Sequence, residues 1–225
     1  MRTHTEFIDF SKLTNAHGAP TVVKIALVCN DLATANSALG HFTNLKSNAL
    51  NHVVQGSRLY FVRMSCGHLR EGIGAIEAIK NDAILDTFVK KCDVRAQSAF
   101  VELSECLPNG KSHKEFVEYI KPVRNTVAFH YDQMQVSSAL AERAKRMTTD
   151  ISSLTIGEDI HSSRFEFADI ILDTIVCRHL WKIPLSADVR IEADCIADWC
   201  FQKSIQFLDF GGEFVRRFLK EHAKV

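Results

Sequence analysis

The fold of this chain is decided by a pattern that is clearest in Pro20-Thr21-Val22-Val23-Lys24-Ile25-Ala26-Leu27-Val28-Cys29-Asn30-Asp31-Leu32. The apolar side chains recur at spacings of three and four residues, which places them on one broad side of an α-helix. A proline at the opening is compatible with a helix, because the first turn has no intrahelical partner for its N–H groups. The stretch therefore predicts a helix with one buried side.

The same spacing continues through most of the chain, whereas strand signals are few. This pattern predicts an all-α helical bundle of about seven to nine helices. Glycines are expected to weaken the helix at 59–80, and Gly211-Gly212 are expected to end one helix and start another. Pro122 either kinks one helix or starts a new one. Further helices are expected at 42–54, 59–80, 83–92, 96–107, from Ser112 toward Pro122, and at 123–131, 137–147, 165–181, 187–208 and 213–222.

The domain prediction is a single all-α domain covering residues 1–225. A candidate internal boundary lies near 107–112, where Pro, Asn and Gly gather in a clear loop. The polar stretch 148–163 is a second candidate. Neither segment is long enough to require two domains.

Charge and composition limit the function classes. The chain has 27 Lys and Arg against 27 Asp and Glu, so a general electrostatic grip on nucleic acid is not expected. DNA is therefore not an expected partner. A modest local excess of basic residues lies between Lys111 and Arg146, and a solvated helix face is the simplest explanation of it.

Cysteine usage and apolar runs bear on the compartment. The seven cysteines are odd in number and form no CxxC or zinc-finger spacing, which indicates reduced thiols and predicts no metal site or cofactor. Residues 1–10 contain acids and lack the apolar core of a signal peptide. No apolar run is expected to approach the roughly twenty residues that cross a bilayer. We therefore expect a cytoplasmic protein without a membrane partner.

The functional prediction rests on one segment, Lys121-Pro122-Val123-Arg124-Asn125-Thr126-Val127-Ala128-Phe129-His130-Tyr131-Asp132. An arginine can hold a phosphate oxygen, and a histidine can move a proton near neutral pH. These two abilities are enough to cleave RNA without a metal, with the ribose 2′-OH as nucleophile. Arg124 and His130 are therefore the candidate catalytic residues, and Asn125 is a candidate for orienting them or the RNA.

The Arg-to-His spacing is weak evidence by itself. Random placement would give about two such pairs, and the chain contains four. Requiring an Asn directly after the Arg reduces the chance expectation to under about a tenth, and only Arg124 meets that requirement.

The combination of Arg124, Asn125 and His130 in a helical setting resembles the HEPN family of small helical bundles. The resemblance covers these residues and their helical surroundings. It implies a HEPN-like core and a metal-independent endoribonuclease of a defence or toxin–antitoxin type. It also implies a homodimer in which two such helices line one composite cleft, with an antitoxin as a further candidate partner. Some HEPN toxins carry a regulatory Tyr two positions after the His, but here Tyr131 directly follows it and Asp132 takes that position.

Helix geometry agrees with the need for two chains. Six residues at roughly 100° each place Arg124 and His130 about 120° apart around a helix and about 9 Å apart along it. They need not meet within one helix, so a second chain is expected to complete the site. Tyr131, seven residues after Arg124, would share its face and is a supporting candidate, and Asp132 is a further one.

Two other functions stay open at this point. The first is a non-catalytic helical module that binds RNA or a partner protein, with His130 simply half-buried between aromatic neighbours. The second is a bundle with an unrelated small-molecule function. Arg63 and His68 could line a second polar pocket, but the adjacent Gly67 favours a helix irregularity there. A lone His68-to-Glu71 HxxE lacks the second motif that a di-iron bundle needs.

Overall fold

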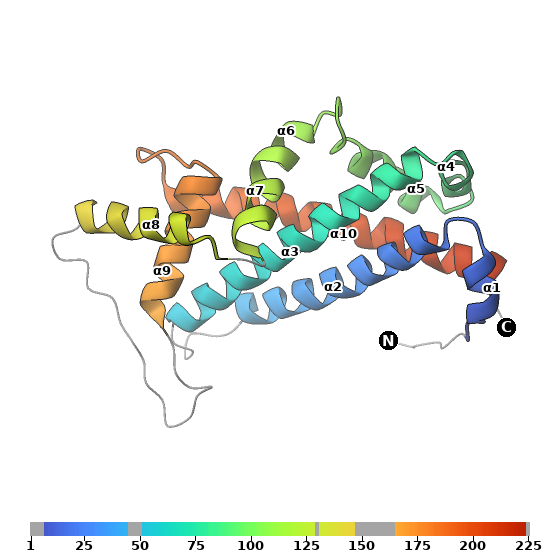
Figure 1. Ribbon diagram of the computed structural model, residues 1–225, viewed down its shortest axis with the longest axis horizontal. Helices are drawn as coiled ribbons and strands as arrows, with labels where there is room; N and C mark the ends of the chain where they lie inside the picture. Colours follow the sequence, from blue (N-terminus) through green and yellow to red (C-terminus); the bar gives the residue numbers. More distant parts are fainter. Residues whose placement is uncertain (1–6, 45–50, 129–130, 147–164, 224–225) are drawn as a thin grey trace, which may run out of the picture. The chain divides into compact units, whose positions relative to one another are not determined.

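The computed structural model describes residues 7–44, 51–128, 131–146 and 165–223 (Figure 1). It is about 82% helical, with nine continuous helices and no strand among the described residues. The prediction of an all-α fold with about seven to nine helices is confirmed.

Most of the helices are regular α-helices from end to end, and two include π-helical turns. The regular helices are α1 (Phe10–Asn15), α2 (Ala19–Asn44), α3 (Asn51–Lys80), α4 (Ala83–Val89), α5 (Val94–Ser104), α8 (Gln133–Arg146) and α10 (Val189–His222), which is the longest. One continuous helix is built from α6 (His113–Glu115), η1 (Phe116–Ile120), α7 (Lys121–Val123) and η2 (Arg124–Ala128), and another from α9 (Glu166–Thr174) and η3 (Ile175–Leu180), where η denotes a π-helical turn.

The chain divides into two compact units. Unit 1 consists of Met1–Ala33, His68–Lys114 and Gln202–Val225, and unit 2 consists of Thr34–Gly67 and Glu115–Phe201. Helices α2, α3 and α10 each give residues to both units. One of the divisions, at Lys114, lies just after the loop at 107–112 that the sequence indicated as a candidate boundary.

The core of unit 1 is built around four phenylalanines of α10. Phe207, Phe210, Phe214 and Phe218 follow one another at spacings of three and four and are fully buried. Ring centroids are 4.9 Å apart between Phe100 and Phe210 and 5.1 Å apart between Phe210 and Phe214. Such ring pairs add about 0.5–1.5 kcal/mol each beyond the burial of their apolar area. This stripe explains why α10 is helical here.

The predicted helix break at Gly211-Gly212 is wrong, because α10 passes through both glycines. A Cβ at Gly211 would lie 2.4 Å from Cys29 Sγ and 2.9 Å from Ile25 Cγ2. On α3, a Cβ at Gly72 would lie 2.7 Å from the Phe207 ring. Within unit 1, these glycines therefore let α10 pack closely against α2 and α3, and this packing outweighs the poor helix propensity of glycine.

Aspartates start the short helices α4 and α5 of unit 1, as Asp9 does for α1. The Asp82 carboxylate accepts the N–H groups of Ile84 and Leu85 at 3.0 and 3.1 Å and so caps α4. Asp93 accepts the N–H of Ala96 at 2.9 Å at the start of α5. Side-chain caps of this kind satisfy backbone donors that have no intrahelical partner.

In unit 2, Pro122 does not start a fresh helix. The helix continues through it, with π-helical turns on either side, in η1 and η2. A proline cannot donate to the usual i−4 carbonyl, and π turns change which carbonyls are paired around it. Val123 and Val127 remain buried on one face. The Trp181 indole Nε1 donates to the Tyr119 carbonyl at 3.0 Å and ties η3 to this helix.

Two further sequence predictions are corrected. The separate helix expected at 42–54 does not form as such: residues 42–44 end α2, residues 51–54 begin α3, and 45–50 lie outside the described residues. The expectation that no apolar run is long enough to cross a bilayer is also wrong. Residues 19–41 of α2 are long and apolar enough by length and composition, with 28% of the best window buried. Core helices and signal sequences share this property.

Candidate functional site

The predicted Arg124-Asn125 pair lies in the π-helical turn η2. Arg124 is half-buried, and its Nη1 donates to the amide Oδ1 of the exposed Asn125 at 3.5 Å. π-Helical turns are rare and are found often at functional sites, because they change the direction of side chains along a helix. His130, the other predicted catalytic residue, lies outside the described residues.

Tyr131 and Asp132 do not continue this helix. The structure describes the helix to Ala128, and residues 131 and 132 are non-helical. The prediction that the helix extends to Tyr131 is therefore wrong, and so is its consequence that Tyr131 shares a helix face with Arg124. The Asp132 carboxylate accepts the N–H groups of Met134 and Gln135 at 2.8 and 3.1 Å. Asp132 thus caps α8, a structural role.

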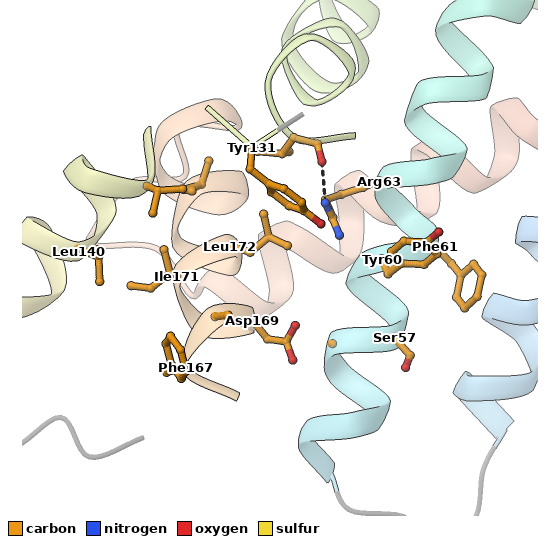
Figure 2. A pocket seen from close by; sticks show the side chains of 15 residues that line it. Ser57, Tyr60, Phe61, Arg63, Tyr131, Leu140, Phe167, Asp169, Ile171 and Leu172 are labelled. Atoms are coloured by element: carbon orange, nitrogen blue, oxygen red, sulfur yellow. Dashed lines mark hydrogen bonds between the residues drawn. The ribbon is translucent and has the colours of Figure 1, made fainter. Parts of the chain in front are cut away.

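Tyr131 instead lines a cavity of about 630 Å³ within unit 2 (Figure 2). Side chains from α3, α8 and α9 surround this cavity together with Val127 of η2. Its size falls within the roughly 300–1,000 Å³ typical of small-molecule sites. Most of the wall is apolar, and the polar exceptions are few. They are Ser57, Tyr60, Arg63, Tyr131 and Asp169.

Arg63 is the most unusual of these residues, because its side chain is buried with only 3% exposed. Its Nη1 donates to the Val127 carbonyl at 2.6 Å, whereas the buried Nε has no hydrogen-bond partner. The guanidinium carbon lies 5.7 Å from the centroid of the Tyr60 ring and 5.8 Å from that of Tyr131. Figure 2 shows Tyr131 extended toward Arg63. Cation–π contacts of this kind offset part of the cost of burying the charge.

The sequence pointed to Arg63 only as a neighbour of His68 in a disfavoured polar pocket. In the structure the two residues have different contacts. His68 Nδ1 lies 3.2 Å from Asp31 Oδ2, whereas Arg63 bonds to a carbonyl 64 positions along the chain. Arg63 could have been identified from its position on the apolar side of a predicted helix. An arginine is rarely buried there unless its charge is compensated.

A second cavity of unit 2, of about 450 Å³, contains Cys177 and Asp173. The Cys177 Sγ donates to Asp173 Oδ1 at 3.5 Å. Burial raises the pKa of the Cys177 thiol far above its ordinary value, and the neighbouring carboxylate adds to the effect. The thiol is therefore protonated at neutral pH and is not a nucleophile there.

His179 has a carboxylate partner in unit 2, as a catalytic histidine often does. Its Nδ1 lies 3.0 Å from Gln135 Oε1, and its Nε2 lies 2.8 Å from Glu142 Oε2. Both ring nitrogens are engaged, so His179 joins η3 to α8 and has no nitrogen left for a substrate. Within the described ranges, no group of three His, Cys, Asp or Glu side chains is placed to hold a metal ion.

The chemistry of unit 2 is thus concentrated in two places, the Arg124-Asn125 turn and the Arg63 cavity. Neither Arg124 nor Asn125 lines the cavity at Arg63 or the one at Cys177. Comparisons of the chain with protein-family models, with curated proteins and with solved structures found no match.

Proposed function

We propose that this chain is a HEPN-like, metal-independent endoribonuclease of a defence or toxin–antitoxin type, active as a homodimer. The observation that carries the proposal is the Arg124-Asn125 pair, whose guanidinium and amide groups lie 3.5 Å apart in a π-helical turn. Six residues after Arg124 the sequence supplies His130, a side chain able to transfer protons near pH 7.

The chemistry divides between these residues. His130 of one chain removes the proton of the ribose 2′-OH, and the 2′-oxygen attacks the adjacent phosphorus. Arg124 binds the phosphate oxygens and stabilises the negative charge that develops on them. The bond from phosphorus to the 5′-oxygen breaks, and a protonated His130 of the second chain gives that oxygen its proton. The products are a 2′,3′-cyclic phosphate and a 5′-hydroxyl.

The surroundings of the pair favour contact with an anion. Asn125 and Lys121 are exposed on the same continuous helix, and Arg124 is half-buried. A half-buried arginine holds a phosphate more firmly than a fully exposed one, because its charge is less screened by water. The alternative function is a non-catalytic helical module that binds RNA or a protein through the same residues.

The first test is RNA cleavage by the purified protein in the presence of EDTA, at about pH 6 to 8, where a histidine can act as acid or base. His130→Ala should lower the rate by about 10²- to 10⁴-fold, the usual contribution of general acid–base catalysis. Arg124→Ala should lower it by about 10²- to 10³-fold, as loss of one charge-stabilising donor does. Arg124→Lys should rescue little, since an ammonium cannot form the bidentate contact.

Arg95→Ala is the matched control, because it removes one positive charge from an exposed ion pair with Asp209 in unit 1. Its rate should equal that of the wild type. Binding of RNA without cleavage by the wild type would favour the non-catalytic module instead. Cleavage that survives His130→Ala would show that the activity comes from elsewhere.

The dimer has a test of its own. The specific activity should fall as dilution separates the chains, in step with the dimer fraction measured by analytical ultracentrifugation. Adding an inactive chain that carries both Arg124→Ala and His130→Ala should inhibit the wild type by forming mixed dimers. A monomer that retains full activity would contradict the composite site.

A further inference from the structure

The buried guanidinium of Arg63 lacks the partners that an enclosed charge normally has. A charged side chain is rarely enclosed unless it is paired, because moving the charge out of water is costly. Arg63 is 3% exposed, and no ion pair to it exists among the residues that the structure describes. One carbonyl and two aromatic rings are its contacts, and its Nε has no partner.

The side chain lines the 630 Å³ cavity of unit 2, so a ligand there can reach it (Figure 2). A guanidinium has five N–H donors, of which the Val127 carbonyl takes one. A carboxylate fits this arrangement, because its two oxygens can accept parallel hydrogen bonds from the fork of an arginine. The guanidinium donors that Val127 does not take therefore indicate the charge and the geometry of a ligand's polar end.

The other walls indicate the rest of the ligand. Leu140, Ile171 and Leu172 line the cavity and offer apolar surface from α8 and α9. Asp169 also lines it, at a place separate from Arg63 in Figure 2. Its negative charge disfavours a doubly charged phosphate more than a singly charged carboxylate. A ligand with a hydrocarbon body and one carboxylate matches the guanidinium of Arg63, the apolar wall and the negative charge of Asp169.

We propose that the Arg63 cavity is a binding site for a small amphiphilic carboxylate, whose anionic end pairs with Arg63 and whose hydrocarbon body lies against Leu140, Ile171 and Leu172. The site is independent of the proposed RNA cleavage, since neither Arg124 nor Asn125 lines the cavity. Tyr131, 69% of whose surface is exposed, also lines the site, and the guanidinium carbon of Arg63 lies 5.8 Å from the centroid of its ring.

Isothermal titration calorimetry of the full chain with sodium octanoate and with 1-octanol tests the proposal, because the two probes share a hydrocarbon body and differ in charge. The wild type should bind octanoate more tightly than octanol. Arg63→Met should weaken octanoate binding about 10- to 100-fold, as expected for loss of hydrogen bonds between charged groups, and change octanol binding little. Asp169→Asn should strengthen octanoate binding by removing a like charge.

Arg58→Met is the matched control, since Arg58 lies on the same helix, is 42% exposed in its side chain, and lines the second cavity of unit 2 but not this one. It should leave the binding of both probes unchanged. Ile171→Trp fills the cavity without touching a charge and should abolish binding of both. If Arg63→Met does not fold, the changes in octanoate and octanol binding caused by Asp169→Asn and Ile171→Trp still test the proposal. Equal affinity of the wild type for the two probes, or no binding of octanoate, would overturn the proposal.

Discussion

Units 1 and 2 are built from the same kinds of helix, yet they handle space and charge differently. In unit 1, four phenylalanines of α10 are fully buried, and glycines bring helices into close contact. Unit 1 also buries a charged side chain, Lys203, but its ammonium lies 3.9 Å from the Glu102 carboxylate. In unit 2, the three π-helical turns η1, η2 and η3 occur, two cavities open, and Arg63 is buried without an ion pair among the described residues.

This contrast separates the part of the chain that serves stability from the part that can serve function. Close packing of apolar side chains is the main source of folding free energy. Cavities, π turns and a partly satisfied buried charge all cost stability, and such costs gather at functional sites. We therefore expect unit 1 to dominate the stability of the protein and unit 2 to hold its binding and catalytic residues. One measurement compares the two units directly, and two more test the close packing and the helix capping attributed to unit 1.

Replacing a large core side chain of unit 1 by alanine should lower the stability most. Phe210→Ala should lower the free energy of unfolding by about 3–5 kcal/mol, because the ring is fully buried between Phe100 and Phe214. Leu172→Ala in unit 2 should cost about 2 kcal/mol or less, since part of that side chain already faces a cavity. Urea unfolding monitored by circular dichroism measures both. Equal losses would mean that the two cores are packed equally well.

Smaller effects, of opposite sign, are expected at two adjacent glycines of α10. Gly211→Ala should destabilise the protein by about 1–2 kcal/mol, because its Cβ would overlap Cys29 and the branched side chain of Ile25. Gly212→Ala should stabilise it by about 0.5–1 kcal/mol, since nothing lies within 4 Å of that Cβ and alanine favours a helix. Thermal unfolding of the two variants beside the wild type measures the signs. A gain for both would show that α2 and α10 are less close than the structure indicates.

A pH dependence at the α4 cap of unit 1 should be smaller still. The hydrogen bond from the Leu85 backbone, and to a smaller extent those from His17 and the Ile84 backbone, hold the pKa of Asp82 below its ordinary value of 3.8. A lowered pKa stabilises the fold above the unfolded value, and this contribution is lost as pH falls through the folded pKa. Asp82→Asn should therefore be less stable than the wild type near neutral pH, and the difference should vanish in acid. A difference that persists unchanged at about pH 2 would assign it to packing.

Much of the fold could be predicted from the sequence, because helix formation depends on a local repeat. The spacing of Val22, Ile25, Val28 and Leu32 predicts α2, and all four are buried. The continuation of α10 through Gly211 could not be predicted, since its reason is a contact with Cys29 and Ile25 far away in the sequence. Glycine propensity is a local quantity, whereas close approach of two helices is not.

The candidate site was predictable only in part, for the same reason. Arg124 and Asn125 are neighbours in the sequence and are in contact in the structure. Arg63 could not be found in this way, because its partners Val127 and Tyr131 are brought to it by folding. The π turn at Arg124 was also invisible, since the sequence pattern of a π turn differs from that of an α-helix by a single residue.

That single residue has a consequence for chain length. A π turn closes its hydrogen bonds over five residues where an α-helix closes them over four, so it holds one residue in excess. Deleting one residue within 124–128 should therefore remove the excess and let the helix continue as α without a change of register, whereas a deletion in a regular α-helix shifts the register by about 100°. The same deletion inside α10 would rotate part of its phenylalanine stripe out of the core. Related chains that differ from this one by one-residue gaps inside helices should therefore carry them at 116–120, 124–128 or 175–180.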